Sequence, residues 1–316
     1  MPKARLKFGL ALGGGAARGW AHVGVIRALQ QARLHPDIVC GTSIGAMVGA
    51  ALASGELDRF ENWIRQLGLI DVVSLMDIGF AGGLLKGDRL VAVFNKTFTD
   101  RPIADLSMPF AAVATDLHTG AEIWLKEGSI SAAVRASIAL PGLLTPAIIH
   151  GRTLVDGGLV NPVPVSLARA MGADVVLAVD LNADLVGRHL RQESSSPVSD
   201  DPGQQWFGDF PQRVGSRLSQ LFRQDGPAVP SVFDVVASSI NIMQVRITRS
   251  RMAGEPPDVT VSPKVSHLGL MEFHRAAEAI EAGQRATLQA LTAVRECLGA
   301  DWVPVDPFEI KGSGQS

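Results

Sequence analysis

Short apolar runs alternate with longer segments of helical periodicity along most of the chain. The apolar runs predict buried strands near 7–12, 37–40, 109–115, 121–125, 153–156 and 174–180. The periodic segments predict helices near 19–32, 43–54, 57–68, 87–97, 129–139 and 164–171. Because strands and helices alternate, we expect an α/β fold in which helices cover a mostly parallel sheet.

The pattern changes in the last third of the chain. Residues 183–230 are rich in Ser, Pro, Asp and Gln, which predicts a flexible insertion after a core formed by residues 1–182. Helices near 232–247 and 271–298 flank a short strand at 258–261, and we expect residues 231–300 to complete the same domain. Residues 301–316 are expected to form a tail.

A serine stands between the second predicted strand and the helix that follows it. Gly41, Ser43 and Gly45 form the pattern G-x-S-x-G. In a nucleophile elbow, such glycines let neighbouring backbones pack around a strained turn, and the helix N-terminus favours negative charge on the serine oxygen. The alternative is a glycine-rich turn with a capping serine. Because both flanks fit the elbow, the pattern favours acyl transfer or hydrolysis.

A glycine-rich loop connects the first strand to the first helix, from Gly13 to Gly19. Such a loop offers backbone N–H groups either to a phosphate or to the oxyanion of a tetrahedral intermediate. A dinucleotide site would require glycine at Ala16 in the pattern that starts at Gly14, and an acidic residue where the next strand ends in Cys40. The chain also has no Gly-Lys-Ser/Thr of a P-loop. These departures favour an oxyanion hole.

A third motif follows the predicted strand at 153–156. Asp156 ends this strand, and Gly157 and Gly158 leave its carboxylate accessible. An Asp-Gly pair by itself is a common turn. The combination of this aspartate with the serine elbow and the glycine loop is more specific than any one of the three.

These three motifs together resemble the patatin-like phospholipase family. The stretches GWAHVGVIRAL, RASIALPGLLTP and GADVVLAVDL are similar to bacterial members. The similarity extends over residues 7–182, with a weaker echo at 232–298. The resemblance implies a three-layer α/β/α patatin-like fold with a mostly parallel central sheet.

The resemblance also implies the roles of the site residues. Ser43 would be the nucleophile and Asp156 its partner in a Ser-Asp dyad, since a carboxylate of raised pKa can take the serine proton and return it to the leaving alcohol. The implied oxyanion hole comprises Gly14, Gly15 and Ala16. Members often have glycine where this chain has Ala16, which is restricted if the loop requires a positive φ. The supporting motif residues are Gly13, Arg18, Gly19, Gly41, Gly45, Gly157 and Gly158.

Two of these residues leave alternatives open. Arg18 would brace the loop, meet a phosphate group or extend into solvent. A histidine base is the rival of Asp156, and His189, His267 and His274 follow it in the order of an α/β-hydrolase triad. None of the three follows a recognisable strand end, and only one strand precedes that of the elbow. The dyad is therefore favoured, and His22 is expected to pack beside the glycine loop.

The predicted function is a serine acyl hydrolase that cleaves fatty-acyl esters of phospholipids or lysophospholipids, with no metal or other cofactor. One alternative is an acyltransferase, but carrier-protein transacylases usually have histidine directly before the serine, where this chain has Thr42. Another is a non-catalytic lipid-binding regulator, which only Ala16 favours. The sequence indicates no oligomeric state.

The net charge and the apolar segments limit the classes of partner and the cellular locations that the sequence allows. A net charge of −2 argues against nucleic acid as the main partner, and no run approaches the ~18 apolar residues of a membrane span. Signal-peptide cleavage near Ala17 would remove the glycine loop, so we expect a cytoplasmic protein with free thiols at Cys40 and Cys297. An amphipathic segment at 203–224 suggests peripheral membrane contact or packing against the core, and 78–85 a lid or a buried connection.

Overall fold

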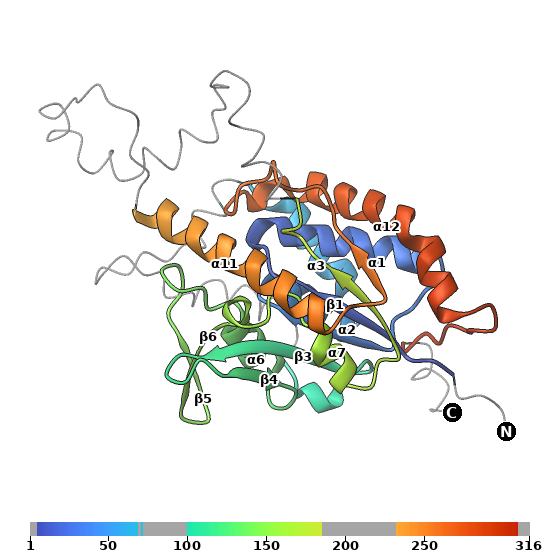
Figure 1. Cartoon of the computed structure of the whole chain (residues 1–316), viewed down its shortest axis with the longest axis horizontal. Coiled ribbons are helices and arrows are strands. Elements are labelled where there is room, and N and C mark those ends of the chain that lie inside the picture. The colour runs from blue at the N-terminus through green and yellow to red at the C-terminus, as the bar shows by residue number, and fades with distance from the viewer. Residues whose placement is uncertain (1–4, 69–70, 72–99, 185–231, 309–316) are drawn as a thin grey trace, which may run out of the picture.

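The computed structural model describes residues 5–68, 71, 100–184 and 232–308. Its centre is an eight-stranded sheet whose hydrogen-bonded path runs β5-β6-β3-β2-β1-β7-β8, with β4 also paired to β3 (Figure 1). The strands are β1 (Phe8–Leu12), β2 (Ile38–Thr42), β3 (Phe110–Asp116), β4 (Glu122–Leu125), β5 (Ala147–Ile149), β6 (Arg152–Asp156), β7 (Val175–Val179) and β8 (Val259–Val261). Strands β3, β2, β1, β7 and β8 are parallel, whereas β4, β5 and β6 pair antiparallel. The predicted α/β/α fold with a mostly parallel sheet is confirmed.

Helices cover both faces of this sheet (Figure 1). The α-helices are α1 (Ala21–Gln31), α2 (Ile44–Ala53), α3 (Leu57–Gln66), α6 (Ile130–Ser137), α7 (Val165–Ala170), α11 (Val232–Gly254) and α12 (Ala276–Leu298). Short 3-10 turns are η1 (Ala16–Trp20), η2 (Ile103–Asp105), η3 (Gly157–Leu159) and η5 (Phe273–Arg275).

The strands divide their side chains between two buried clusters. Leu10 of β1 and Leu177 of β7 belong to the cluster under α1, α2 and α12, whereas Ala11 and Val176 belong to the cluster under α7. Because neighbouring residues of a strand point to opposite faces, a sheet buried on both sides has continuous apolar strands. This is why the strands were recognisable as apolar runs without alternation.

Close helix packing joins the C-terminal part to the N-terminal part. A Cβ added to Gly24 of α1 would lie 1.8 Å from the carbonyl oxygen of Ile280, and one added to Gly283 of α12 would lie 1.9 Å from that of Ala21. Only glycine permits this approach of two helix backbones. Strand β8 also extends the sheet beside β7, so residues 232–308 pack onto the same core as residues 5–184.

Most predicted elements lie where the pattern placed them, with a few differences. Strand β5 was not predicted, because Ala147–Ile149 is a three-residue strand with Ile148 exposed. Helix α11 extends to Gly254, beyond the predicted end at 247. The predicted helix at 87–97, the segments 78–85 and 203–224, and nearly all of the insertion at 183–230 lie outside the described residues. Within the described residues, no helix is long and apolar enough to cross a membrane.

Candidate active site

Strand β3 aligns the two ends of chain that carry the predicted dyad. Residues 112–115 of β3 pair with β4 along one edge, so β2 and β6 share the other edge. On that edge Thr42 pairs with Val113, and Asp156 pairs with Ala114. The residue after β2 and the last residue of β6 therefore lie side by side, although they are far apart in the sequence.

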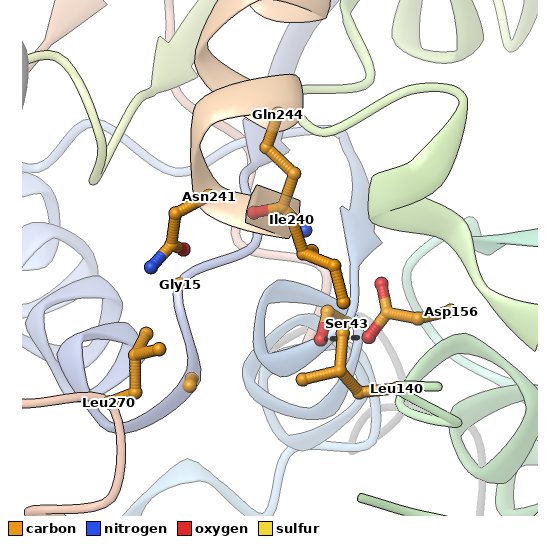
Figure 2. A pocket seen from close by; sticks show the side chains of 9 residues that line it. Gly15, Ser43, Leu140, Asp156, Ile240, Asn241, Gln244 and Leu270 are labelled. Atoms are coloured by element: carbon orange, nitrogen blue, oxygen red, sulfur yellow. Dashed lines mark hydrogen bonds between the residues drawn. The ribbon is translucent and has the colours of Figure 1, made fainter. Parts of the chain in front are cut away.

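The register brings the Ser43 hydroxyl to the Asp156 carboxylate. Ser43 Oγ donates to Asp156 Oδ2 at 2.6 Å (Figure 2). The backbone N–H of Gly158 donates to Asp156 Oδ1 at 2.7 Å. Asp156 is buried. Burial raises the pKa of its carboxyl to about 6, even though the hydrogen bonds from Ser43 and Gly158 lower it. A carboxylate with a pKa in this range can both accept and return a proton near neutral pH.

Buried hydrogen bonds fix the backbone on both sides of this pair. The N–H of Ser43 donates to Ser137 Oγ at 2.8 Å, and Ser137 Oγ donates to the carbonyl oxygen of Val113 at 2.6 Å. On the other side, Asp156 N–H donates to Ala139 O at 2.9 Å, and Thr115 Oγ1 donates to Asp156 O at 2.8 Å. Ser137 was not among the predicted site residues, since one serine inside a helix carries no signal of its own.

The elbow has the strained backbone that its motif suggested. Ser43 has φ 56° and ψ −125°, an unusual conformation for a residue with a side chain. A Cβ added to Gly41 would lie 2.3 Å from the carbonyl of Gly45, and one added to Gly45 would lie 2.2 Å from Leu12 O. Both glycines are therefore required by close packing between β1, β2 and α2.

The glycine loop leaves two backbone N–H groups open beside Ser43. Gly15 and Ala16 line the same pocket as Ser43, and their N–H groups have no acceptor among the described residues. Gly14 was predicted as a third donor, but its N–H donates to Pro162 O at 2.9 Å and is occupied. Of the three predicted donors, only the N–H groups of Gly15 and Ala16 are therefore without an acceptor among the described residues.

Ala16 adopts the left-handed conformation that its motif position had put in question. Its φ is 50°, in the region that favours glycine. For an alanine this conformation costs roughly 1 kcal/mol. The strain is accordingly located at one of the two residues whose N–H group faces the pocket.

His22 and Arg18 are buried beside the glycine loop. His22 Nε2 lies 2.7 Å from Gly13 O, and complete burial lowers the pKa of this imidazole to about 4, so it is neutral and donates. Arg18 is also buried, which excludes the solvent-exposed alternative, and its Nη2 lies 3.5 Å from Asn241 Oδ1. Burial lowers the Arg18 pKa to about 10, although Asp184 and Asp180 oppose the shift.

None of the histidines in the described ranges replaces Asp156. His267 pairs instead with Glu278 at 2.6 Å on the surface, and no hydrogen bond joins Ser43 or Asp156 to an imidazole there. His189 lies outside the described residues. Also within the described ranges, no three His, Cys, Asp or Glu side chains gather closely enough to hold a metal ion.

Helix α11 forms the wall of the pocket opposite the elbow. Ile240, Asn241 and Gln244 line it from this helix (Figure 2). Leu140, just after α6, and Leu270, before η5, add apolar surface. A helix is predicted here from the sequence, but without a part in the site. The residues of α11 that line the pocket lie more than eighty residues after Ser43 and after Asp156, so no local pattern links them to the motifs.

A serine elbow and a glycine loop at the C-terminal edge of a mostly parallel sheet define an α/β protein of the nucleophile-elbow class. The family model for patatin-like phospholipase matches residues 10–169, which is half of the chain. The chain belongs to the patatin-like phospholipase family, as the sequence motifs predicted.

Individual relatives agree with this assignment. An uncharacterized NTE family protein of Mycobacterium bovis is 31% identical over 330 residues, covering 91% of this chain and 92% of the relative. Patatin-like phospholipase domain-containing protein 6 of Homo sapiens is 36% identical over 182 residues, covering 55% of this chain and 13% of that protein. The crystal structure of VipD from Legionella pneumophila aligns with a TM-score of 0.45 at 15% identity, over 92% of this chain and 67% of that one.

Proposed function

We propose that this protein is a serine acyl hydrolase that cleaves fatty-acyl esters of phospholipids or lysophospholipids through an acyl-enzyme. The observation that carries the proposal is the 2.6 Å hydrogen bond between Ser43 Oγ and the buried Asp156 carboxylate. The family supplies the substrate class, since its description is that of phospholipases. The apolar side chains of Leu140, Ile240 and Leu270 give the pocket a surface suited to an acyl chain.

In the first half-reaction, Ser43 Oγ attacks the ester carbonyl carbon while Asp156 Oδ2 accepts the hydroxyl proton. The negative charge that develops on the carbonyl oxygen is stabilised by the N–H groups of Gly15 and Ala16 and by the N-terminus of α2. Asp156 then delivers the proton to the leaving alcohol oxygen as the ester bond breaks. In the second half-reaction, water attacks the acyl-enzyme and the same groups repeat their roles.

Transfer of the acyl group to another alcohol would use the same acyl-enzyme. Thr42, in the position where carrier-protein transacylases usually have histidine, is buried and donates its hydroxyl to Asn161 O at 2.8 Å. It cannot serve there as a base for Ser43. This supports water as the acceptor, and product analysis in the presence of glycerol or lysophospholipid separates hydrolysis from transfer.

The test is covalent labelling by a fluorophosphonate probe together with hydrolysis of p-nitrophenyl esters of graded chain length. We expect Ser43→Ala to abolish labelling and to lower kcat/KM at least about 10⁴-fold, and Asp156→Asn to lower it at least about 10³-fold. His267→Ala and His189→Ala are the matched controls, and both should keep wild-type activity. Labelling that persists in Ser43→Ala would refute the nucleophile, and full activity in Asp156→Asn would refute the dyad.

A further inference from the structure

The side chain of Gln244 is a mostly buried polar group that has no hydrogen-bond partner among the described residues, and it faces the candidate active site. Only 6% of Gln244 is exposed, and its carboxamide has no hydrogen bond to any described residue. It extends from α11 into the pocket that Ser43 and Asp156 line (Figure 2). Buried amides are nearly always hydrogen-bonded, so an unpaired one that faces a pocket points to a ligand.

The position of the amide identifies the side of the pocket that it serves. A Cβ added to Gly158 would lie 2.4 Å from Gln244 Nε2 and 3.0 Å from Asp156 Oδ1. Gln244 Nε2 and Asp156 Oδ1 thus both lie within 3.0 Å of the position that a Cβ of residue 158 would occupy. The amide nitrogen is therefore near the Asp156 carboxylate. The open N–H groups of Gly15 and Ala16 belong to the glycine loop, which is a different part of the wall.

The mechanism of ester cleavage indicates whether Gln244 contacts the alcohol half or the acyl half of the substrate. Asp156 must return the serine proton to the leaving oxygen, so the alcohol half of the ester lies against Asp156. The acyl oxygen points instead toward Gly15 and Ala16. A group next to Asp156 on the pocket wall therefore contacts the alcohol half.

We propose that the Gln244 carboxamide binds the alcohol half of the ester through a hydroxyl group, which selects acyl esters of glycerol or a similar polyol over simple alkyl esters. The inference rests on the proposed function. A carboxamide has two N–H donors and a carbonyl acceptor, and a hydroxyl can satisfy either. The neighbouring Asn241 is less suited, since its Oδ1 already faces Arg18 Nη2 at 3.5 Å.

The experiment compares two esters of the same acid, 1-monolauroylglycerol and propyl laurate, which differ only in the hydroxyl groups of the alcohol. Gln244→Met keeps the length of the side chain and removes its hydrogen bonds. We expect its kcat/KM for monolauroylglycerol to fall about tenfold, the size of one hydrogen bond, and its kcat/KM for propyl laurate to change less than about twofold. The matched control is Met243→Leu, the next residue of α11, whose side chain is 48% exposed; it should match the wild type on both esters.

Two results would overturn the proposal. An equal loss on both esters would mean that Gln244 only supports packing, and an unchanged kcat/KM for monolauroylglycerol would mean that it does not contact the alcohol.

Binding measurements separate a failure of this proposal from a failure of the proposed function. In the Ser43→Ala background, adding Gln244→Met should weaken binding of monolauroylglycerol about tenfold by calorimetry. This holds whether or not the protein hydrolyses the ester. If the wild type cleaves neither ester and Ser43 is not labelled, the proposed function is wrong, and the calorimetry alone decides on Gln244: an unchanged Kd would refute its role.

Discussion

The serine elbow and the glycine loop are both glycine-rich connections from a strand to a helix, but Gly45 of the elbow and Gly14 of the loop differ in how closely they are packed. In the elbow, a Cβ on Gly45 would lie 2.2 Å from Leu12 O. In the loop, a Cβ on Gly14 would meet nothing closer than Ser43 Cβ at 3.5 Å. Positive φ occurs at neither glycine but at Ser43, with 56°, and at Ala16, with 50°. Glycine permits close packing at Gly45 and also at Gly13, Gly15 and Gly19 of the loop, whereas the positive φ angles occur at two residues that line the pocket.

The two turns also differ in how their backbone N–H groups are used. The N–H of Ser43 is bonded to Ser137 Oγ at 2.8 Å, whereas those of Gly15 and Ala16 have no acceptor among the described residues. A turn that presents a side chain benefits from a fixed backbone, but a turn that presents N–H groups must leave them open. Gly45 of the elbow is therefore expected to tolerate substitution less well than Gly14 of the loop.

The largest effect is expected from adding a methyl group to the elbow. Gly45→Ala forces a Cβ against the backbone of β1 and should lower the free energy of unfolding by at least about 3 kcal/mol. Gly14→Ala, the matched change in the loop, should lower it by less than about 1 kcal/mol. Urea unfolding followed by circular dichroism measures both. Similar losses in the two variants would contradict the difference in packing between Gly45 and Gly14.

The next effect concerns the carboxylate that the elbow hydroxyl contacts. Burial raises the Asp156 pKa to about 6 from 3.8, so the folded protein binds a proton more tightly than the unfolded chain. The stability of the wild type relative to Asp156→Asn should therefore be greatest below pH 4, fall as pH rises to about 6 and stay constant above, a change of about 3 kcal/mol. Urea unfolding of both proteins across this range measures it.

Hydrolysis should show the opposite trend, because the base must be ionised. With an uncharged ester, kcat/KM should rise about tenfold per pH unit below pH 6 and level off above it. The glycine loop contains no acidic residue or histidine. Substitutions in this loop should therefore leave the midpoint of the pH dependence of kcat/KM unchanged. If the residual kcat/KM of Asp156→Asn still rose with pH with the same midpoint near pH 6, another group would be the base.

A smaller effect is expected from Ser137, which holds the elbow from α6. Ser137→Ala removes the hydrogen-bond acceptor of the Ser43 N–H and one hydrogen bond to the Val113 carbonyl, and should lower the free energy of unfolding by about 2 kcal/mol. Its kcat/KM should fall about tenfold, since Ser43 is less well positioned. Ser54→Ala is the control, because its hydroxyl donates only to carbonyls of its own helix α2, and it should change stability by less than about 0.5 kcal/mol. Equal effects would show that the elbow does not depend on Ser137.

The smallest effect is expected at Ala16 in the loop. Ala16→Gly relieves the left-handed strain, which is worth roughly 1 kcal/mol. Glycine also gives the unfolded chain more conformational entropy, which destabilises the folded protein by about 0.4–1 kcal/mol. The free energy of unfolding should therefore stay within about 1 kcal/mol of the wild type. Ala17→Gly, one residue later and without a positive φ, should instead destabilise by about 1 kcal/mol or more. Thermal unfolding of the two variants compares them. A larger loss at Ala16 than at Ala17 would contradict the strain assigned to this position.

The elements and motifs of this protein are determined by the sequence itself. The parallel strands were predictable because burial on both faces makes them continuous apolar runs, and Ser43 and Asp156 could be proposed as site residues because each stands at a strand end beside glycines. The family was recognisable from the same motifs. Strand β5 was not predictable, since three residues with an exposed isoleucine carry no pattern.

Only the tertiary structure decided how these parts combine. Ser43 and Asp156 are 113 residues apart, and their contact depends on the register that β2 and β6 share along β3. The same holds for the hydrogen bond from Gly14 N–H to Pro162 O, the support from Ser137 and the position of Gln244 in the pocket beside Ser43 and Asp156. Each is a contact between segments distant in the sequence, and local patterns of residues specify local structure but not the partner that a hydrogen-bonding group finds across the fold.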